Sequence, residues 1–503
     1  MSEISYVVLS DLHLGAAYSL LTDCDDSGRA RPTQASPVLC ALAAGLRETM
    51  SVAAGDAAPT LVLLGDVFDL AFSSPVDVMA AFERFVGEMF DPAQPAVFAP
   101  RILYVPGNHD HRHWQIMRDE MDVTALGLTT GPEIPPSAVI TELFPDSFPV
   151  CQVATALARR ATGHSDLVVE SGYPNVGFRS DDRWVVLHHG HYTESMYRAI
   201  SAMVPLFGNA PVVEAFELEL LNGPWIDFLW SSFGGQGAVG AGMFDLFETM
   251  QDAAASHDAI KTIATRVLQS ASSMMPVRSD ATISTHGMTV SVRGLVEGLL
   301  DISLARFAQS ERIDADTVLS PGGIEGVQWY LSNTVHRQLA DAGWSRGSDH
   351  DVSFVFGHTH KPFQDQLLVD GYDRPVQVWN TGGWVLDQPS LSPAQGAAAV
   401  VIDSDANIAS IRLFNDPVAG DVGEVRVAGC NGIDPDGNPL IARLAAAVAS
   451  ATVWGAFSAA CLPEIDKRSR FLRGRFFDAA ADPPIPDGRT RPTDQVATTK
   501  GRQ

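Results

Sequence analysis

Residues 352–360 read Val-Ser-Phe-Val-Phe-Gly-His-Thr-His, an apolar run that ends in a glycine and two histidines. Four further segments have the same form, a hydrophobic run followed by residues of the kind that bind metals. Their polar parts are Asp11-Leu12-His13, Gly65-Asp66-Val67-Phe68-Asp69, Gly107-Asn108-His109-Asp110 and His188-His189-Gly190-His191. A short apolar run before a turn residue is typical of a buried strand. The sequence therefore predicts five strands that each end at candidate metal ligands.

These strands are predicted at residues 6–9, 61–64, 102–105, 184–187 and 352–356. Open α/β sheets place their sites at the carboxyl ends of the strands, so the five segments are expected to meet there. Side chains two residues apart on extended backbone point the same way, so Asp11 and His13 are expected to bind one ion together. The same applies to His358 and His360. Gly65, Gly107 and Gly357 stand directly before candidate ligands, as expected for sharp turns.

The residue types indicate which metals would bind. Carboxylate, imidazole and amide ligands suit Mn, Fe, Zn or Co, and no cysteine lies near the five segments. A lone histidine after a strand is more often a core residue than a ligand. However, nine of the 14 histidines lie in or beside these segments: His13, His109, His111, His113, His188, His189, His191, His358 and His360. Two ions held together can activate a bridging hydroxide for in-line attack on phosphorus.

The series D-x-H, GDxxD, GNHD, H-G and GHxH, in this order and at strand ends, resembles the calcineurin-like metallophosphoesterases. The resemblance implies an α/β fold, a four-layer α/β/β/α sandwich of two mixed sheets, here with a large helical insertion. It also implies two divalent ions, with Mn favoured. Carried over motif by motif, it assigns Asp11, His13 and His360 to metal one, Asn108, His189 and His358 to metal two, and Asp66 to both.

Two further segments, Ser10–Gly15 and Asn380–Trp384, resemble the branch of bacterial UDP-diacylglucosamine pyrophosphatases. Those enzymes usually carry arginine where this chain has His109. His109 follows the ligand Asn108 and is expected to face the leaving group as a general acid. Asp110 either orients His109 or caps the turn, and Asp69 has the same ambiguity towards the loop of Asp66.

Other polar residues near the ligands have less defined roles. The family's ligand directly precedes the glycine of the fourth segment, so His189 is preferred to His188. Arg112 and His191 are candidates for contact with the substrate phosphate, as are His111 and His113, or they have ordinary surface roles.

Composition limits the other possibilities. The chain has 503 residues, 46% of them hydrophobic, and can form two or three domains. A net charge of -26 opposes binding to nucleic acid. The five cysteines are odd in number and lack C-x-x-C spacing, which favours a reduced, cytoplasmic setting. The first strand begins near Ile4, and no secretory signal is expected before it.

The predicted organisation places the first part of the catalytic core at 1–194, with helices at 38–53 and 76–90. A mainly helical insertion follows at 195–350, with helices at 193–204, 212–221, 244–255 and 290–308. Its aromatic cluster is either core or a cap that grips an apolar part of the substrate. The cluster comprises Trp225, Phe228, Trp230 and Phe233. The second part of the core, 351–415, is expected to complete the second sheet with strands at 376–379, 397–402 and 408–414.

A C-terminal extension is predicted at 416–481, with an Ala-rich helix at 440–462, and a disordered tail at 482–503. Residues 444–462 carry no charge and precede several basic residues, a pattern shared by packed helices and membrane-contacting segments. A packed helix is favoured, and peripheral membrane contact stays open. Oligomeric state has no sequence signature here.

Together these features predict a phosphoester or pyrophosphate hydrolase acting on a phosphorylated small molecule or lipid-linked substrate. The alternatives are a nucleic-acid or cyclic-nucleotide phosphodiesterase and a non-catalytic scaffold with the same fold. The metal ligands alone do not distinguish monoesters, diesters and pyrophosphates.

Overall fold

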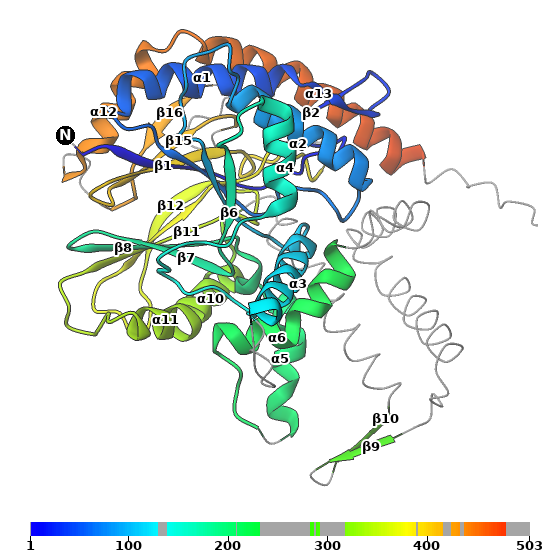
Figure 1. Cartoon of the computed structure of the whole chain (residues 1–503), viewed down its shortest axis with the longest axis vertical. Helices are drawn as coiled ribbons and strands as arrows, with labels where there is room; N and C mark the ends of the chain where they lie inside the picture. The colour runs from blue at the N-terminus through cyan, green and yellow to red at the C-terminus, as the bar shows by residue number, and fades with distance from the viewer. Residues whose placement is uncertain are drawn as a thin grey trace, which may run out of the picture.

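The computed structural model describes residues 2–128, 138–207, 209–231, 282–285, 288–291, 317–388, 391–415, 424–432 and 437–478. Two mixed sheets dominate it (Figure 1). The first has the strand order β16 (Arg426–Ala428), β15 (Ile408–Arg412), β14 (Ala398–Asp403), β1 (Ile4–Leu9), β4 (Thr60–Leu64), β5 (Arg101–Val105), β6 (Val168–Ser171). The second has the order β12 (Phe363–Leu367), β13 (Val376–Asn380), β11 (Asp351–Phe356), β8 (Arg183–His188), β7 (Asn175–Arg179). The α/β prediction with two mixed sheets is confirmed.

The direction of the strands brings the five motif segments together. Strands β1, β4, β5 and β6 run parallel in the first sheet, and β8, β11 and β13 run parallel in the second. The predicted strands are confirmed as β1, β4, β5, β8 and β11. The carboxyl ends of neighbouring parallel strands lie at the same edge of a sheet, so each sheet collects its own motif segments at one edge.

Side chains alternate between the two faces of each strand, as expected for buried strands. Val8 and Val62 pack between the two sheets against Val185 and Val355 of the second sheet. Val7 and Leu61, one residue earlier on each strand, pack in the outer core of the first sheet instead. Both faces of the central strands are therefore dry, which explains their continuous apolar sequences.

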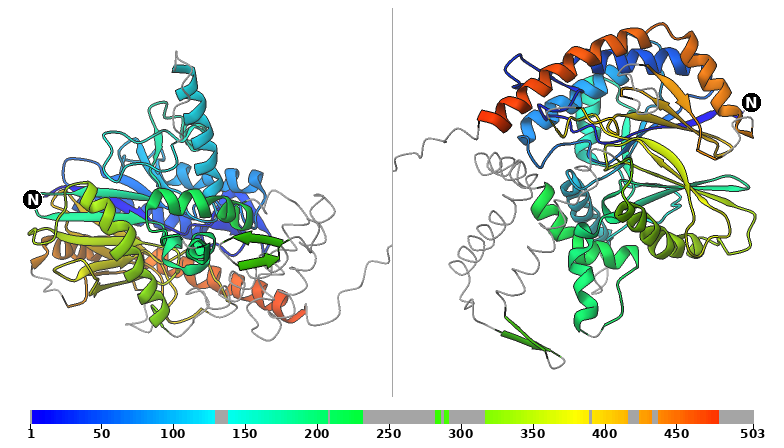
Figure 2. Two further views of the ribbon diagram at one scale, coloured as in Figure 1. Left: turned by 90° about the horizontal axis from the view of Figure 1, so that it is seen from below. Right: turned by 180° about the vertical axis from the view of Figure 1, so that it is seen from behind.

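Helices cover the outer face of each sheet (Figures 1 and 2). Over the first sheet lie α1 (Pro37–Ala53), α2 (Pro75–Met89), α4 (Gln152–Thr162), α12 (Pro439–Ser450) and α13 (Trp454–Asp478). Against the second lie α6 (Ala215–Ile226), α10 (Pro321–Tyr330), η6 (Leu331–Val335) and α11 (His336–Asp341). The predicted helices 38–53 and 76–90 are confirmed as α1 and α2. Each begins with Ser-Pro, in which the serine hydroxyl accepts a hydrogen bond from a backbone N–H of the first turn.

One strand assignment was wrong. The strands predicted at 397–402 and 408–414 were expected in the second sheet, but β14 pairs antiparallel with β1 and β15 with β14. Only β13 joins the second sheet, parallel to β11. An apolar run identifies a buried strand, but it does not identify the strand that pairs with it.

The C-terminal extension is integrated with the core. Strand β16 pairs with β15, and α12 and α13 pack against α1. The single helix predicted at 440–462 is instead two helices, with buried Leu444 on α12 and buried Phe457 and Cys461 on α13. In the described part of the chain no single helix is long and apolar enough to cross a membrane, and α12 and α13 meet that criterion only as a pair bent by 78°.

The insertion is helical over much of its described length. The predicted helix 193–204 is divided into η1 (His191–Thr193), η2 (Ser195–Arg198) and α5 (Ala199–Met203), followed by η3 (Val204–Phe207). The helix predicted at 212–221 is α6, which continues into the π-helical turn η4 (Asp227–Ser231). The predicted helix 244–255, Phe233 and the tail 482–503 lie outside the described residues. So does most of the predicted helix 290–308.

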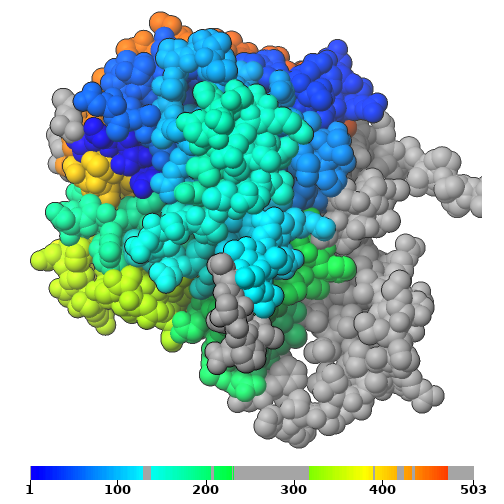
Figure 3. Space-filling model, in the orientation of Figure 1, coloured from blue at the N-terminus to red at the C-terminus, as the bar shows by residue number. Residues whose placement is uncertain are grey.

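Two short antiparallel ribbons complete the described elements. Residues 290 and 291, the start of the helix predicted at 290–308, belong to β10 (Met288–Ser291), which pairs with β9 (Thr282–Thr285). The second ribbon pairs β2 (Thr22–Cys24) with β3 (Ala30–Ala35). Helix α3 (His111–Leu128) begins directly after the third motif segment and lies against η4. In the space-filling view, the cyan surface of α3 adjoins green residues of the insertion (Figure 3).

Candidate metal centre

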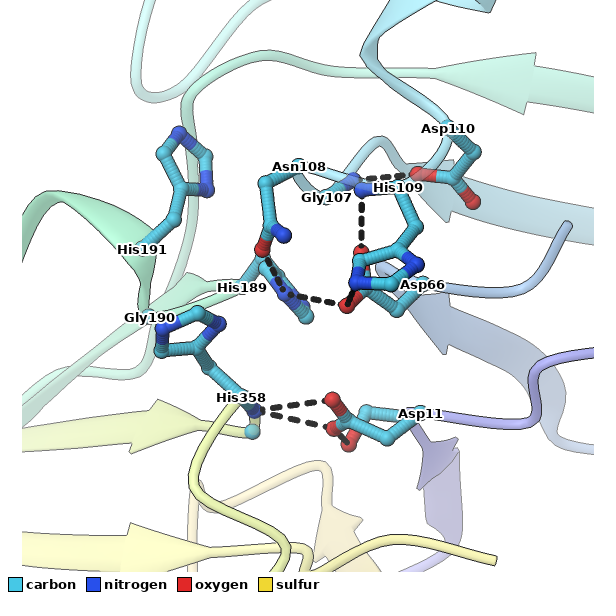
Figure 4. A network of polar contacts seen from close by, with 12 residues as sticks. Asp11, Asp66, Gly107, Asn108, His109, Asp110, His189, Gly190, His191 and His358 are labelled. Carbon is cyan, nitrogen blue, oxygen red and sulfur yellow. Dashed lines mark hydrogen bonds and ion pairs between the residues drawn. The ribbon is translucent and has the colours of Figure 1, made fainter. Parts of the chain in front are cut away.

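The turns after β1, β4, β5, β8 and β11 converge, so that ligands from both sheets face one another (Figure 4). All seven predicted ligands are at most 1% exposed: Asp11, His13, Asp66, Asn108, His189, His358 and His360. Their nitrogen and oxygen atoms form two groups with the spacing of metal ligands, Asp11/His13/His360 (group one) and Asp66/His189/His358 (group two). Group one is the set expected for metal one, and group two contains three members of the set expected for metal two, which also includes Asn108. A third group with the same spacing joins His13, Asp69 and His109.

Group one is compact. His360 Nε2 lies 3.3 Å from Asp11 Oδ1 and 3.3 Å from His13 Nε2. The Asp11 carboxylate also accepts a hydrogen bond from the backbone N–H of His358, at 2.9 Å to Oδ2. Asp11 therefore links the first sheet to the turn that carries the two histidines of the second.

Asn108, the predicted amide ligand, lies beside group two. His189 Nε2 lies 3.4 Å from Asp66 Oδ2 and 3.1 Å from Asn108 Oδ1. The opposite ring nitrogen, His189 Nδ1, faces the carbonyl of Leu64 at 3.0 Å. That contact fixes the ring with Nε2 directed at the carboxylate.

Asp66 lies between the two groups. Its Oδ2 is 3.4 Å from His189 Nε2 and 3.7 Å from His13 Nε2, while its Oδ1 accepts the His109 N–H at 2.8 Å. Oδ2 is buried and accepts no hydrogen bond from the described residues. Both ring nitrogens of His358 are likewise buried without a hydrogen bond from the described residues, and Nε2 faces Glu194 Oε1 at 3.4 Å. Buried polar atoms are normally satisfied, so these atoms fit a pair of divalent cations.

The backbone of the turns differs from the extended form predicted for Asp11 and His13. Five of the candidate ligands have left-handed backbone, with φ of 51° at Asp11, 44° at His13, 49° at Asp66, 71° at His358 and 59° at His360. Such conformations cost about 1–3 kcal/mol each for residues other than glycine and cluster at functional sites. Side chains two residues apart do converge here, but through sharp turns after the strands.

Close packing explains the glycines before the ligands. A Cβ on Gly65 would collide with the His189 ring, and one on Gly357 would collide with the Asp11 carboxylate. Backbone bonds hold the first turn, since Asp11 N–H donates to Gly65 C=O and His13 N–H to Asp66 C=O, both at 2.9 Å. The turns of neighbouring strands therefore fix each other.

The buried charges interact strongly. Burial alone would raise the pKa of Asp66, but the charges of His189 and His109 hold that pKa well below its usual value. Burial alone would lower the pKa of His189, but the nearby charge of Asp66 raises it to about 9. Burial lowers the pKa of His13 to about 4 despite Asp69. The site thus holds ionised carboxylates beside imidazoles, which favours cations.

The two carboxylates beside His109 have different roles. His109 Nδ1 lies 2.9 Å from Asp69 Oδ1, and Tyr18 donates to Asp69 Oδ2 at 3.0 Å. Asp110 takes the other role that the sequence offered, the capping of the turn. It accepts backbone hydrogen bonds from Gly107 at 2.6 Å and Val67 at 2.8 Å, which join two motif turns. Burial and the charge of Asp66 raise the pKa of Asp110 to about 6.

The remaining candidates lie around this centre. His188 Nδ1 accepts the Gly190 N–H at 2.8 Å, and it is His189 that joins group two. His191 is buried, with Nε2 3.3 Å from the Tyr173 hydroxyl. Arg112, one of the candidate phosphate contacts, is exposed on α3.

Two further histidines on α3 are buried. His111 Nε2 lies 3.1 Å from Glu219 Oε1. The ring of His113 packs against Phe68 at 4.4 Å between centroids. Their contacts place both in the interior around α3, whereas the sequence had offered them as phosphate contacts.

An aromatic pair from the insertion lies against the centre and is called here the aromatic wall, comprising Tyr197 and Trp230. Tyr197 packs on the ring of the candidate ligand His358 at 5.2 Å between centroids, and Trp230 packs on His109 at 6.2 Å. The two rings pack on each other at 5.7 Å. Ser231, next to Trp230, donates to Asn108 C=O at 2.6 Å.

Sequence reasoning singled out Trp230 within the aromatic cluster, but it missed Tyr197 and Ser231. Phe228, from the same cluster, is 57% exposed, and Trp225 is half-buried. Position along the insertion carries no signal that separates these roles.

A buried carboxylate, Glu219, anchors α6, the helix that continues into η4 and Trp230. It accepts hydrogen bonds from the hydroxyls of Tyr173 and Tyr192 at 2.9 and 2.8 Å and faces His111. Gln115 also donates to it, at 3.3 Å. Helix α6 is thereby joined to α3 and to the segments next to β7 and β8.

Comparisons with known proteins give little further guidance. No protein-family model and no curated protein sequence matches the chain. Among solved structures, phosphopantetheinyl hydrolase from Mycobacterium tuberculosis matches with 12% identity and a TM-score of 0.22, over 76% of this chain and 90% of that chain. A likeness this distant supports no inference about activity.

Proposed function

We propose that the chain is a dinuclear-metal-dependent phosphoester or pyrophosphate hydrolase of the calcineurin-like type. The observation that carries the proposal is Asp66 Oδ2, buried without a hydrogen bond from the described residues between imidazoles of group one and group two. Asp11, His13 and His360 would hold one ion, and Asn108, His189 and His358 the other. Mn is the favoured metal because the family resemblance implies it and because the carboxylate, amide and imidazole set lacks sulfur.

Two such ions supply an activated water nucleophile and neutralise negative charge on the phosphoryl oxygens. The protein's own contribution is positional. The left-handed turns keep the carboxylates and imidazoles preformed and dry, which strengthens their interaction with charge.

His109 is the proposed general acid. Asp69 holds its Nδ1, and its Nε2 is 4.0 Å from Asp66 Oδ2 and so faces the centre. A proton on Nε2 can pass to the leaving oxygen as its bond to phosphorus breaks. Asp69 thus takes the orienting role, and Asp110 shapes the turn that presents His109.

The aromatic wall supports a substrate class. It extends from the ligand His358 to the proposed acid His109, so the part of a substrate beyond its phosphate would meet Tyr197 and Trp230. Aromatic side chains favour apolar or planar partners. We therefore propose a phosphorylated small molecule or lipid-linked substrate with an apolar or aromatic group near the phosphate. The charge of -26 opposes nucleic acid.

The test combines metal analysis with hydrolysis. Chelator-stripped protein is titrated with Mn²⁺ and assayed on an aryl phosphate monoester, an aryl diester and a nucleotide-sugar pyrophosphate. Two bound ions per chain and Mn-dependent hydrolysis of one class are expected. Asp365→Asn, at an exposed position on β12, is the matched control for substitutions of the buried aspartates. Two bound ions without hydrolysis of any class would favour the scaffold alternative.

A further inference from the structure

A carboxylate outside the five motifs contacts a proposed metal ligand. His360 Nδ1 lies 2.7 Å from Asp387 Oδ2, while Nε2 of the same ring faces Asp11 and His13 in group one. The Asp387 side chain is 6% exposed. The imidazole therefore joins two parts of the site, with one nitrogen directed at group one and the other at a buried negative charge.

The loop that carries Asp387 is tied to the turn of another ligand. Trp384 N–H donates to Asp11 C=O at 3.0 Å, and Trp384 C=O accepts the Leu20 N–H at 2.7 Å. Leu386 N–H donates to Tyr18 C=O at 3.3 Å. The backbone that supports Asp11 thus also fixes the position of Asp387.

A side chain from the same region holds the carboxylate itself. Gln395 Nε2 donates to Asp387 Oδ2 at 3.0 Å, and Gln395 Oε1 accepts the Ser392 N–H at 3.3 Å. Asp387 Oδ2 accordingly meets both Gln395 and His360. This arrangement limits the rotation of the carboxylate and keeps it on the imidazole.

The matching histidine of group two has a neutral partner. His189 Nδ1 faces the Leu64 carbonyl, whereas His360 Nδ1 faces a carboxylate. An imidazole that donates to a carboxylate has a fixed tautomer and is a more basic metal ligand, and loss of such a partner typically weakens metal binding 10- to 100-fold. The other histidine of group two, His358, has Nε2 3.4 Å from Glu194 Oε1, so the shorter carboxylate contact, at 2.7 Å, is the one that His360 makes with Asp387.

We propose that Asp387 is a positioning residue that fixes His360 for metal binding. It thereby raises the affinity of group one for its ion relative to the affinity of group two. Its role presupposes the proposed metal centre. Asp387 lies outside the five motifs, and the proposal predicts that the two ions bind with different affinities. Asp387 orients His360 as Asp69 orients His109, but toward metal binding instead of proton transfer.

The test is Asp387→Asn, which keeps the size of the side chain and an acceptor oxygen but removes the charge. Stepwise Mn²⁺ affinities are measured by competition with a chelating dye. One of the two affinities should fall about 10-fold or more, and the other should stay within about twofold. Asp365→Asn, an equal charge change at the surface, should leave both affinities unchanged.

Thermal melts separate this role from a structural one. In excess chelator, Asp387→Asn should melt like the wild type, and only the stabilisation by Mn²⁺ should shrink. If that variant does not fold, Gln395→Met replaces it, with the same selective loss expected on a smaller scale. Equal weakening of both ions, or unchanged affinities, would overturn the proposal. If the wild type itself fails to bind two ions, the proposed function fails instead.

Discussion

The turns that carry the candidate metal ligands and the aromatic wall meet at one site but are built differently. The turns follow strands of the two central sheets and are fixed by backbone hydrogen bonds, such as Asp11 N–H to Gly65 C=O. The wall comes from the insertion and is fixed by side chains, through Ser231 to Asn108 C=O and through Glu219. The candidate reactive groups therefore lie on turns that the backbone of the core fixes, whereas Tyr197 and Trp230 are buried side chains in the hydrophobic cluster of the second sheet.

This contrast predicts that changes in the turns affect all substrates, while changes in the wall affect only some. Asp66→Asn should have the largest effect, because the substitution removes the charge between the two groups. Turnover should fall to background on every substrate, and the bound metal per chain should decrease. Metal analysis beside the assay checks this. Activity near that of the wild type with two retained ions would exclude the bridging role.

His109→Ala should have the next largest effect. Turnover on a substrate with a poor leaving group should fall about 100-fold or more, the usual contribution of a general acid. Metal content should not change, because His109 belongs to neither metal group of the proposal. The loss should shrink with an activated aryl leaving group, which needs little protonation. Equal losses on both substrates would contradict the assignment.

Asp69→Asn provides a sharper form of the same test. It keeps a polar side chain beside His109 but removes the charge that faces Nδ1. The same dependence on leaving group is expected with a smaller loss. Asp110→Asn should instead lower stability, because Asp110 holds the Gly107 and Val67 turns.

Much of this site could be predicted from the sequence. The seven proposed ligands stand at predictable strand ends, since apolar runs, glycines and ligand types coincide there. The partner strands of β14 and the left-handed backbone at Asp11 could not be predicted, because both depend on contacts distant in sequence. Asp387 and Glu219 carried no signal for the same reason. From the sequence alone, a single acidic residue in a loop or helix is expected to be exposed, and only the fold shows that it is buried.

The anchor of the insertion should show an effect on stability with no change in metal binding. Glu219→Ala would leave the hydroxyls of Tyr173 and Tyr192 without their buried acceptor, which costs about 1–3 kcal/mol. Chemical denaturation of the metal-free protein measures this cost. Glu217→Ala, at an exposed position on the same helix, is the matched control. A fall in Mn²⁺ affinity in Glu219→Ala would show that wall and turns are coupled more tightly than their contacts indicate.

The smallest predicted effect concerns the wall itself. Trp230→Ala removes the indole that packs on His109, so KM for a substrate with an apolar group near the phosphate should rise about 10-fold, or about 1.4 kcal/mol of binding energy. A small activated ester that does not reach the wall should be hydrolysed almost as before. A contact that stabilises the bound substrate and the transition state equally affects KM, so its loss raises KM and leaves kcat nearly unchanged.

The same substitution at Trp225 is the control, because Trp225 is half-buried on α6 and makes no ring contact with the described residues of the centre. Its KM values should stay unchanged on both substrates. If Trp230 were only a core residue, its truncation would cost about 3–5 kcal/mol of stability and lower activity on both substrates in parallel. Thermal melts of both variants decide between these outcomes. A selective rise in KM without a matching loss of folded protein would assign substrate choice to the insertion. Parallel losses of stability and of activity on both substrates would show that the aromatic wall serves only in packing.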